Sequence, residues 1–356
     1  MAGSTSIHHL ERVASIRAFS LLRPHPVPSG TPGETGGPRV VTTVALDLDL
    51  AMGAPGSDID DGFALALALA DPEIDVALVT TVNGNTDVAT ATTLTLELLR
   101  QLDAEHLPVH RGAARALLHP AERFGMVPLG IPARSPRPGH AVQAMTDLVR
   151  ARPGEVTLVA LGPLTNVALA MTLDPDFAGA LGGLVIMGGV FAGSTGARGM
   201  PGEFNVWSDP EAARIVLQSG VVARWVGLDV TRQVRLTRAE AQAMAEDPHP
   251  FTAFAGLYSR SWIDHLAATS EPGTDSCALH DALAVAAVTR PDLLDFVDVH
   301  LEVQLDGVTR GVMVADRLDA NVNAHVALGV DPVGFREHLN ASLRRPRLAG
   351  QWMTAS

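Results

Sequence analysis

The sequence predicts an α/β protein in which a mostly parallel central sheet carries helices on both faces. Two observations lead to this prediction. From Val40 onward, short apolar, β-branched runs alternate with Ala-rich amphipathic runs, and this repeated strand-then-helix order is typical of parallel sheets. The 356 residues, 47% of them hydrophobic, also suffice for a large buried core. Ligands of such folds lie beyond the carboxyl ends of the strands, so the residues that follow each strand are the first candidates for a site.

The two ends of the chain depart from this alternation. Residues 1–39 finish in RPHPVPSGTPGETGGPR, which holds too much Pro and Gly for a helix or a central strand. We therefore predict a flexible N-terminal extension over residues 1–39 and a single domain over residues 40–356. Near the C-terminus, residues 297–317 alternate around Asp306-Gly307, which predicts a small β-hairpin.

The stretch Val40–Ala70 is rich in acids. An apolar run ends in two alternating acids, a Gly/Pro turn follows, and a further acidic group opens an apolar helix. These carboxylates would repel one another unless a cation or shared protons offset their charge: Asp47, Asp49, Asp58, Asp60 and Asp61. Helix capping by Asp58 or Asp60 explains one or two of the acids, and the surplus favours a metal site. Oxygen ligands indicate Ca²⁺ or Mg²⁺ rather than zinc.

Small or polar residues also follow the later predicted strands, at Asn83-Gly84-Asn85, 162–166 (GPLTN), Met187-Gly188-Gly189 and Asp229. His280 and Asp281 stand before another apolar helix. The Gly/Pro-rich loops His119–Gly139 and Phe191–Phe204 are long enough to act as lids over a site.

Several of these motifs have a structural interpretation as well. Asp281 and Thr165 would each serve as a helix N-cap, and Ser208-Asp209-Pro210-Glu211 is typical of a cap followed by proline at the first helical position. Glu203 and Asn205 would either hold sugar hydroxyls or anchor their own loop. Spacing alone leaves these alternatives open.

Composition excludes several classes of function. A net charge of -13 argues against a nucleic-acid partner, and no apolar run approaches the ~20 residues that a membrane span requires. The sequence has no lysine, which excludes a phosphate-loop lysine and a Schiff-base lysine. The single cysteine, Cys277, permits no intrachain disulfide and is consistent with a cytoplasmic protein.

Taken together, the motifs resemble the inosine-uridine-preferring nucleoside hydrolase family, over about residues 41–339. That family opens with a DxD…GxDxDD-type motif, which the acids between Asp47 and Asp61 match together with Gly56. Five further segments agree in order: VNGN at 82–85, GPLTN at 162–166, MGG at 187–189, EFNVWSDPEA at 203–212 and LHDALAV at 279–285. The resemblance implies a Rossmann-like core and a homodimer or homotetramer.

The resemblance also implies a role for each matching residue. Asp49 would bind Ca²⁺ and act as general base on the attacking water, and His280 stands where the family keeps a leaving-group acid. The other Ca²⁺ ligands would be Asp61, the Thr165 carbonyl and Asp281. The ribose would be held by Asp60, Asn85, Met187, Glu203 and Asn205.

One helix carries an aromatic residue every four positions, at Phe254, Tyr258 and Trp262. This spacing fits either a core stripe or an apolar wall against a flat base, and in the second case Tyr258 and Trp262 would bind the substrate.

The implied chemistry suits these residue types. Cleaving an N-glycosidic bond builds positive charge on the ribose ring, which carboxylates stabilise. A cation lowers the pKa of a bound water, and a histidine can protonate the departing base. Direct attack by water with inversion at the anomeric carbon is expected.

One departure from the family motif bears on this function. Residues Ala51–Pro55 form an insertion of about five residues between Asp49 and Gly56. An insertion that bulges outward would leave the chemistry intact, whereas one that fills the pocket would change substrate choice or activity.

Two other functions compete with hydrolysis of an ordinary nucleoside. The chain would be a nucleoside-binding or regulatory homologue with weakened activity, or a hydrolase of a modified nucleoside, if the insertion disturbed the site. Asp47-Leu48-Asp49 alone also resembles the start of haloacid-dehalogenase phosphatases, which normally use a lysine that this chain lacks.

Overall fold

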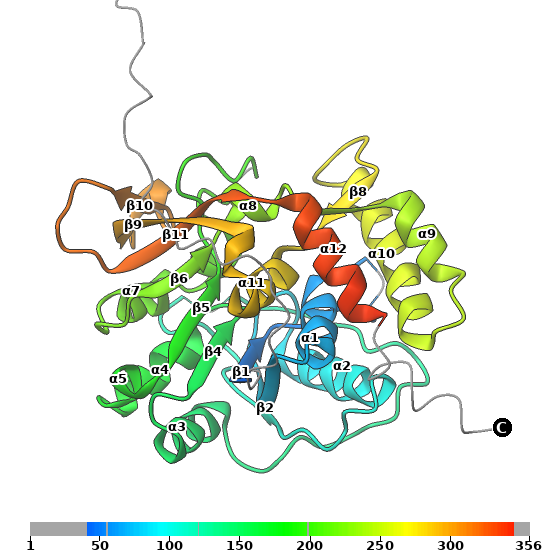
Figure 1. The fold of residues 1–356 in the computed structure, drawn as a ribbon, viewed down its shortest axis with the longest axis horizontal. Helices are drawn as coiled ribbons and strands as arrows, with labels where there is room; N and C mark the ends of the chain where they lie inside the picture. Colours follow the sequence, from blue (N-terminus) through cyan, green and yellow to red (C-terminus); the bar gives the residue numbers. More distant parts are fainter. Residues whose placement is uncertain (1–40, 55, 120, 198, 345–356) are drawn as a thin grey trace, which may run out of the picture. The chain divides into compact units, whose positions relative to one another are not determined.

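A nine-stranded sheet forms the middle of the molecule (Figure 1). The computed structural model describes residues 41–54, 56–119, 121–197 and 199–344, so the predicted extension over residues 1–39 lies outside the described residues. The strands are β1 (Thr42–Leu48), β2 (Ile74–Thr81), β3 (Val109–Arg111), β4 (Val156–Ala160), β5 (Gly183–Met187), β6 (Ala223–Val226), β7 (Arg235–Thr237), β8 (Ser276–Ala278), β9 (Leu294–Val303), β10 (Met313–Asp316) and β11 (Ala324–Val330).

The helices connect these strands and cover the sheet. They are α1 (Asp60–Ala70), α2 (Val88–Gln101), α3 (Ala141–Ala151), α4 (Thr165–Leu173), α5 (Phe177–Ala180), α6 (Phe204–Ser208), α7 (Pro210–Leu217), α8 (Leu228–Thr231), α9 (Arg238–Ala245), α10 (Pro250–Ala268), α11 (His280–Thr289) and α12 (Pro332–Leu343), with short 3₁₀ turns η1 (Pro291–Leu293) and η2 (Gly307–Thr309). Among the described residues, no helix is long and apolar enough to cross a membrane.

The strand order is β10-β9-β11-β6-β5-β4-β1-β2-β3, and every pairing from β11 to β3 is parallel. The chain runs from β1 outward to β3 and then returns to the other side of β1 as β4. The order therefore reverses between β1 and β4, and the crevice beyond the carboxyl ends of these two strands is where such folds bind ligands.

The two faces of the sheet are covered by different helices, because strand side chains alternate between faces. On β1, Val44 and Leu46 pack with α1, α11 and α12 in one hydrophobic cluster. Ala45, which points to the opposite face, packs with α3, α4 and α7 in a second cluster. The predicted α/β architecture with helices on both faces is confirmed.

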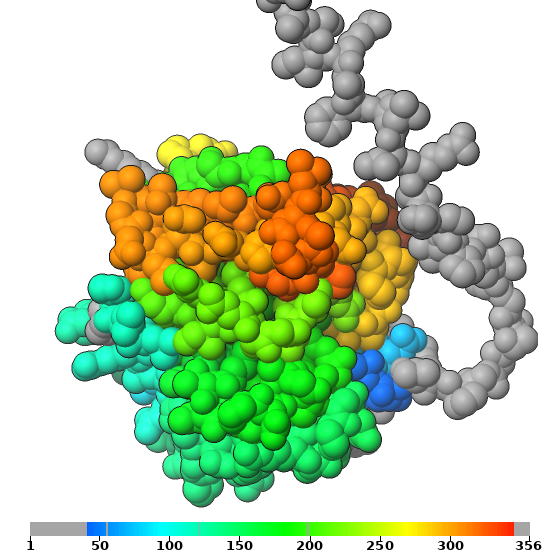
Figure 2. All heavy atoms as spheres, turned by 90° about the vertical axis from the view of Figure 1, so that its left-hand side faces the viewer, coloured from blue at the N-terminus to red at the C-terminus, as the bar shows by residue number. Residues whose placement is uncertain are grey.

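An antiparallel hairpin extends one edge of the sheet. Strands β9 and β10 pair from Val303–Met313 to His300–Asp316, and the turn between them contains Asp306-Gly307 as predicted. In Figure 2 the orange segment that holds β9 and β10 lies beside the lighter green segment that holds α7. Strands β7 and β8 form a separate antiparallel pair. In the chain, β7 follows α8 and β8 precedes α11.

Candidate active site

Two acids at the end of β1 stand two residues apart but have different surroundings. Asp47 is buried, and its Oδ1 accepts hydrogen bonds from Thr80 Oγ1 (2.7 Å) and Asn166 Nδ2 (2.9 Å). Burial raises the pKa of Asp47 to about 6, although both hydrogen bonds lower it. Because Asn166 also bonds to Thr81 and Ala113, this acid holds neighbouring strand ends together.

Asp49 lies just beyond β1, against the loop that follows β2. Its Oδ2 accepts a hydrogen bond from the Asn85 backbone N–H (2.8 Å), and Asn85 Nδ2 lies 3.4 Å from its Oδ1. A side chain at Gly84 would meet this carboxylate, since an added Cβ would stand 1.9 Å from Asp49 Oδ2. The lack of a side chain at Gly84 therefore leaves room for the Asp49 carboxylate.

The acidity of Asp49 is strongly perturbed. Burial raises its pKa to about 8, and the nearby charges of Asp60, Glu203 and Asp47 act in the same direction. The Asp49 carboxyl is therefore mostly protonated at neutral pH unless a nearby cation lowers its pKa.

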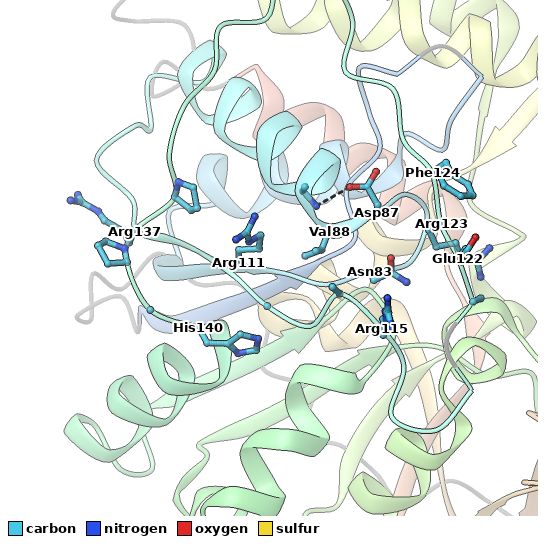
Figure 3. A pocket seen from close by; sticks show the side chains of 17 residues that line it. Asn83, Asp87, Val88, Arg111, Arg115, Glu122, Arg123, Phe124, Arg137 and His140 are labelled. Atoms are coloured by element: carbon cyan, nitrogen blue, oxygen red, sulfur yellow. Dashed lines mark hydrogen bonds between the residues drawn. The ribbon is translucent and has the colours of Figure 1, made fainter.

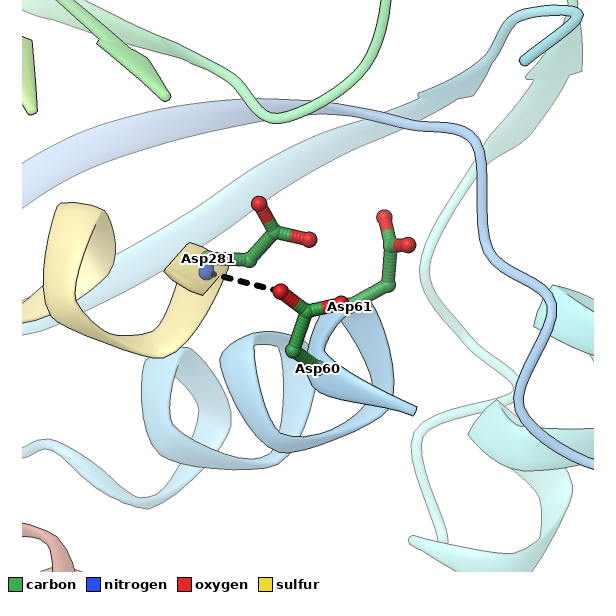
Figure 4. Close-up of side chains that lie close together, drawn as sticks. All are labelled: Asp60, Asp61 and Asp281. Atoms are coloured by element: carbon green, nitrogen blue, oxygen red, sulfur yellow. Dashed lines mark hydrogen bonds between the residues drawn. The ribbon is translucent and has the colours of Figure 1, made fainter. Parts of the chain in front are cut away.

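The N-termini of α1 and α11 bring a further set of acids together. These helices pack side by side, and single carboxylate oxygens of Asp60, Asp61 and Asp281 lie within 4.8 Å of one another (Figure 4). The Asp281 backbone N–H donates to Asp60 Oδ2 (3.2 Å), and Asn85 Nδ2 lies 3.4 Å from Asp61 Oδ2. Asn85 thus contacts both Asp49 and Asp61.

Helix capping does not explain these acids. The N-cap of α1 is Ile59, which has no side-chain cap, and Asp58 accepts the N–H of Ile59 itself (2.7 Å). Asp60 and Asp61 lie in the first turn of α1, where the helix dipole favours negative charge. Capping by Asp58 or Asp60, the structural alternative, is not what the fold uses.

The acidic cluster fits a hard cation. Burial, and after it the neighbouring carboxylates, raise the pKa of Asp61 and of Asp281 well above the ordinary range. Asp61 Oδ1 is buried with no hydrogen-bond partner in the described part of the chain. A divalent cation would satisfy that oxygen and offset the repulsion, and an all-oxygen donor set suits Ca²⁺ or Mg²⁺. Asp60, which the resemblance assigned to the ribose, is a member of this cluster.

Glu203 and Asn205 approach the site from the loop before α6. Glu203 caps α6, with Oε1 accepting from Asn205 N (2.9 Å) and Oε2 from Gly189 N (3.0 Å). Asn205 Nδ2 donates to the carbonyls of Leu161 (2.8 Å) and Met187 (3.2 Å), which follow β4 and end β5. The pair anchors its loop to the strand ends and leaves the Asn205 side-chain oxygen without a partner in the described residues.

His280 opens α11 next to Asp281. Its Nδ1 lies 2.7 Å from Thr231 Oγ1, and burial lowers its pKa, so the ring is neutral at pH 7. A Thr231 hydroxyl that donates to Nδ1 leaves the ring proton on Nε2. Such a proton is available to a group in the adjoining cavity.

A cavity of about 660 Å³ joins these side chains. This volume suits a ligand of nucleoside size. Of the predicted residues, the following line it: Asp60, Asn85, Met187, Glu203, Asn205, Trp262, His280 and Asp281. Apolar contact comes from Leu228, Leu266 and Trp262, and Trp262 stacks on His265 at 5.3 Å.

Four predicted residues lie outside this lining: Asp49, Asp61, Thr165 and Tyr258. Asp49 and Asp61 both contact Asn85, which does line it. Tyr258 packs against Phe254, with ring centroids 4.7 Å apart, as a core stripe would. Thr165 begins α4, and its Oγ1 donates to Asp209 Oδ2 (2.7 Å). Asp209 caps α7 before Pro210, as its sequence motif predicted.

Residues 51–54 of the insertion Ala51–Pro55 pack against α1, the helix that Asp60 and Asp61 begin. Residues 51–54 are buried, Met52 and Ala54 join the hydrophobic cluster around α1, and Pro55 lies outside the described residues. An added Cβ at Gly62 would stand 2.2 Å from Met52 Sδ, which shows how closely this segment covers α1. Residues 51–54 do not line the cavity, so the described part of the insertion leaves the pocket open.

Two residues bind the first part of the loop 191–204 by hydrogen bonds, and neither was predicted to have this role. Asp229 accepts from the backbone N–H groups of Phe191 (2.8 Å) and Ala192 (2.9 Å). Arg232 donates to the carbonyls of Ser194 (2.9 Å) and Thr195. Asp229 followed a predicted strand and was a visible signal, whereas no local pattern pointed to Arg232.

Comparison with known proteins decides the family. A family model described as inosine-uridine preferring nucleoside hydrolase matches residues 44–337. The chain belongs to this family. The chain is 33% identical over 263 residues to the pyrimidine-specific ribonucleoside hydrolase RihA of Shewanella sp. strain MR-7, covering 70% of this chain and 81% of that protein. It is 31% identical over 254 residues to uridine nucleosidase 1 of Arabidopsis thaliana, covering 67% and 74%.

Solved structures support the same assignment. A plant nucleoside hydrolase, the PpNRh1 enzyme, has a TM-score of 0.78 and 29% sequence identity, over 86% of this chain and 99% of that chain. The resemblance to the nucleoside hydrolase family is therefore confirmed. Family membership identifies the chain as an N-ribosyl hydrolase, and its acid-lined cavity carries the residue types that cleavage of an N-glycosidic bond requires.

Proposed function

We propose that this nucleoside hydrolase cleaves uridine and related ribonucleosides with Ca²⁺ as its cofactor. The observation that carries the proposal is the group of buried carboxylates with an unpartnered Asp61 oxygen at the switch point of the sheet. A hard cation would offset the charge of these carboxylates and suits their oxygen donors. Its ligands would be Asp49, Asp61, Asp281 and the Thr165 carbonyl, with Asp60 beside them. When bound, it would polarise a water molecule and lower its pKa.

The carboxylates of the cavity would act on the ribose. Positive charge develops on the sugar ring as the glycosidic bond lengthens, and fixed carboxylates stabilise that charge without having to reorganise. Asp60, Asn85, Glu203 and Asn205 offer acceptors and amides for the ribose hydroxyls, with Met187 against the ring. Their burial strengthens each interaction, because little water competes.

Asp49 would accept the proton of the attacking water. A cation bound beside it would lower its raised pKa and leave the carboxylate ionised and able to take a proton, and its two contacts with Asn85 fix the direction of the carboxylate. No side chain of the cavity needs to form a covalent bond with the sugar, so we expect inversion at the anomeric carbon.

His280 would serve the departing base. The Thr231 contact orients the ring, and its Nε2–H would donate a hydrogen bond to the departing base. Full proton transfer would need the ring to carry a second proton, because neutral imidazole is too weak an acid. The apolar surface of Trp262, Leu228 and Leu266 would hold the flat base beside His280. The names of two relatives, both pyrimidine nucleosidases, support uridine as the first substrate to test.

A reducing-sugar assay with and without chelator tests this function. We expect ribose release from uridine, with inosine, cytidine and adenosine as comparisons, a loss of activity in chelator, and recovery when Ca²⁺ is restored. A phosphatase substrate serves as the negative control. Absence of ribose from every nucleoside in the presence of Ca²⁺ would contradict the proposal in favour of a nucleoside-binding homologue.

The resemblance further suggests a cytoplasmic homodimer or homotetramer. Light scattering coupled to size-exclusion chromatography measures the assembly directly. A monomer at micromolar concentration would contradict this part of the proposal.

A further inference from the structure

A second cavity, of about 1050 Å³, opens on the other side of the loop Asn83–Asn85. Asn83 lines this cavity, whereas Asn85 lines the catalytic one. Its walls come from the end of β3, the start of α2 and the loop from residue 112 to 139, which contains the predicted lid His119–Gly139. No residue of this cavity has a role in the proposed hydrolysis.

Four arginines give the cavity its character: Arg111, Arg115, Arg123 and Arg137. Figure 3 shows Arg137 and His140 at one side of the view and Arg115 and Arg123 at the other, with Arg111 between them. Among the described residues, the side chains of Arg111, Arg115 and Arg137 make no ion pair or hydrogen bond. These three arginines are exposed, so their charges stay in contact with water.

The acids of the cavity do not neutralise these arginines. Asp87 is occupied as the N-cap of α2, where it accepts from Ala89 N (3.0 Å), Thr90 N (3.0 Å) and Gly125 N (2.8 Å). These bonds lower its pKa and keep it anionic. Glu122 is exposed and makes no ion pair among the described residues. Four guanidinium groups against two carboxylates leave an excess of positive charge.

Arginine differs from other cations in the ligand that it suits. Its planar group presents paired N–H donors that match the oxygens of a phosphate, and it holds its charge at every physiological pH. The cavity also has an apolar surface, to which Val88 and Phe124 contribute. Its volume exceeds what a bare anion needs and is of the size that organic ligands occupy.

The cavity is linked to the catalytic one through Arg123. Its guanidinium carbon lies 4.8 Å from the centroid of the Phe204 ring, and Nη2 donates to Ser208 Oγ (3.3 Å). Phe204 lines the catalytic cavity. Arg123 is also close enough for the Asp49 charge to act on it.

We propose that the cavity formed around Arg111, Arg115, Arg123 and Arg137 is a binding site for a phosphate dianion, next to the nucleoside site. Two sources carry this chemistry, a nucleotide-sized organic phosphate and free inorganic phosphate. The proposal concerns binding alone and stands whether or not the catalytic cavity cleaves nucleosides.

Isothermal titration calorimetry on the full chain tests the proposal. The probes are uridine 5′-monophosphate, inorganic phosphate and uridine, in a chelator that prevents calcium phosphate formation. The variant is the double substitution Arg111→Gln with Arg137→Gln. Arg152→Gln is the matched control, because Arg152 is an exposed arginine outside the cavity.

We expect both phosphates to bind the natural chain and the double variant to bind them at least about tenfold more weakly, which is the loss typical of a removed charge-assisted hydrogen bond. The control should bind as the natural chain does. Tighter binding of the nucleotide would identify an organic phosphate as the ligand, and equal binding would identify the free anion; both results support the site. Binding should also weaken as salt is raised.

Two results would overturn the proposal. One is the absence of heat or saturation with either phosphate at millimolar concentration. The other is an equal loss in Arg152→Gln and the double variant, which would indicate nonspecific attraction. Because no turnover is measured, failure here is distinguishable from a failure of nucleoside hydrolysis.

Discussion

The two cavities on either side of Asn83–Asn85 hold charges of opposite sign in opposite settings. The catalytic cavity is lined by nearly fully buried carboxylates, among them Asp60, Glu203 and Asp281 at 3% exposure each. The neighbouring cavity gathers arginines, of which Arg111 and Arg137 are exposed. Both stand at the carboxyl edge of the same sheet.

This difference determines what each cavity requires. Buried like charges raise one another's pKa and persist as anions only with a cation or a shared proton. Exposed arginines remain hydrated and screened, so they can stay unpaired until an anion arrives. The carboxylates of the acidic cavity therefore need a cation or shared protons to offset their repulsion. The arginines of the basic cavity are stable in water without a ligand.

The largest expected effect separates Asp49 from Asp47. Asp49→Asn should lower kcat for uridine by about 10²–10⁴-fold, because the amide cannot accept the proton of water. Asp47→Asn should lose far less, since its side-chain oxygen can still accept from Thr80 and Asn166. Steady-state ribose release measures both, with circular dichroism to show that each variant folds. Near-normal turnover in Asp49→Asn would remove this residue from the role of base.

His280 gives an effect that depends on the substrate. His280→Ala should slow uridine by about 10²-fold, because the departing base loses its proton donor. An activated aryl riboside, whose leaving group needs no proton, should be slowed much less. The ratio of the two rates is the measurement, and Thr231→Val tests the orienting contact. Equal losses on both substrates would count against the acid role.

The smallest expected effect concerns Glu97, a carboxylate that forms ion pairs with two arginines. Arg134 donates to Glu97 (2.8 Å), and Arg100 pairs with the same carboxylate (2.7 Å), so hydrogen bonds and charge lower the pKa of Glu97 to about 2. A depressed folded-state pKa stabilises the protein above the unfolded value of 4.5 and loses that stabilisation as pH falls toward 2.

Glu97→Gln should therefore reduce the free energy of unfolding at pH 7 by about 1 kcal/mol, a figure discounted for the exposure of Arg100. Urea unfolding measures the difference, which should narrow below pH 4.5. Glu122→Gln is the control, since Glu122 has no ion pair among the described residues and should change little at any pH. A constant difference down to low pH would show that the ion pairs are not its source.

Much of the fold was predictable from local pattern. A continuous apolar run predicts β1, and the apolar run that follows the acids predicts α1, because both elements are buried on nearly all sides. The Asp209-Pro210 cap and the Asp306-Gly307 turn were predictable for the same reason, since backbone geometry demands those residue types.

The site was predictable as a set of residues and less so as an arrangement. Asp49, Asn85, Asp61 and Asp281 are distant in sequence, and motif order identified them as members of one site. Which of the predicted residues would bind a cation and which would bind the substrate was not predictable. Asp60 lies with Asp61 and Asp281, and Tyr258 packs against the hydrophobic core. The grouping of Asp60 depends on how closely α1 and α11 pack, which no local pattern encodes.

By itself, the sequence determined that acids would follow β1 and open α1, that the sheet would be parallel and that a family of hydrolases shares these motifs. Only the tertiary structure decided which acids meet. The parallel pairing of β1 with β2 brings Asp49 to Asn85, and the contact of α1 with α11 brings Asp281 to Asp60. It also decided that four arginines from separate segments would share one cavity. The physical reason is that such proximity comes from packing of distant elements, whereas sequence pattern reports only the preferences of neighbours.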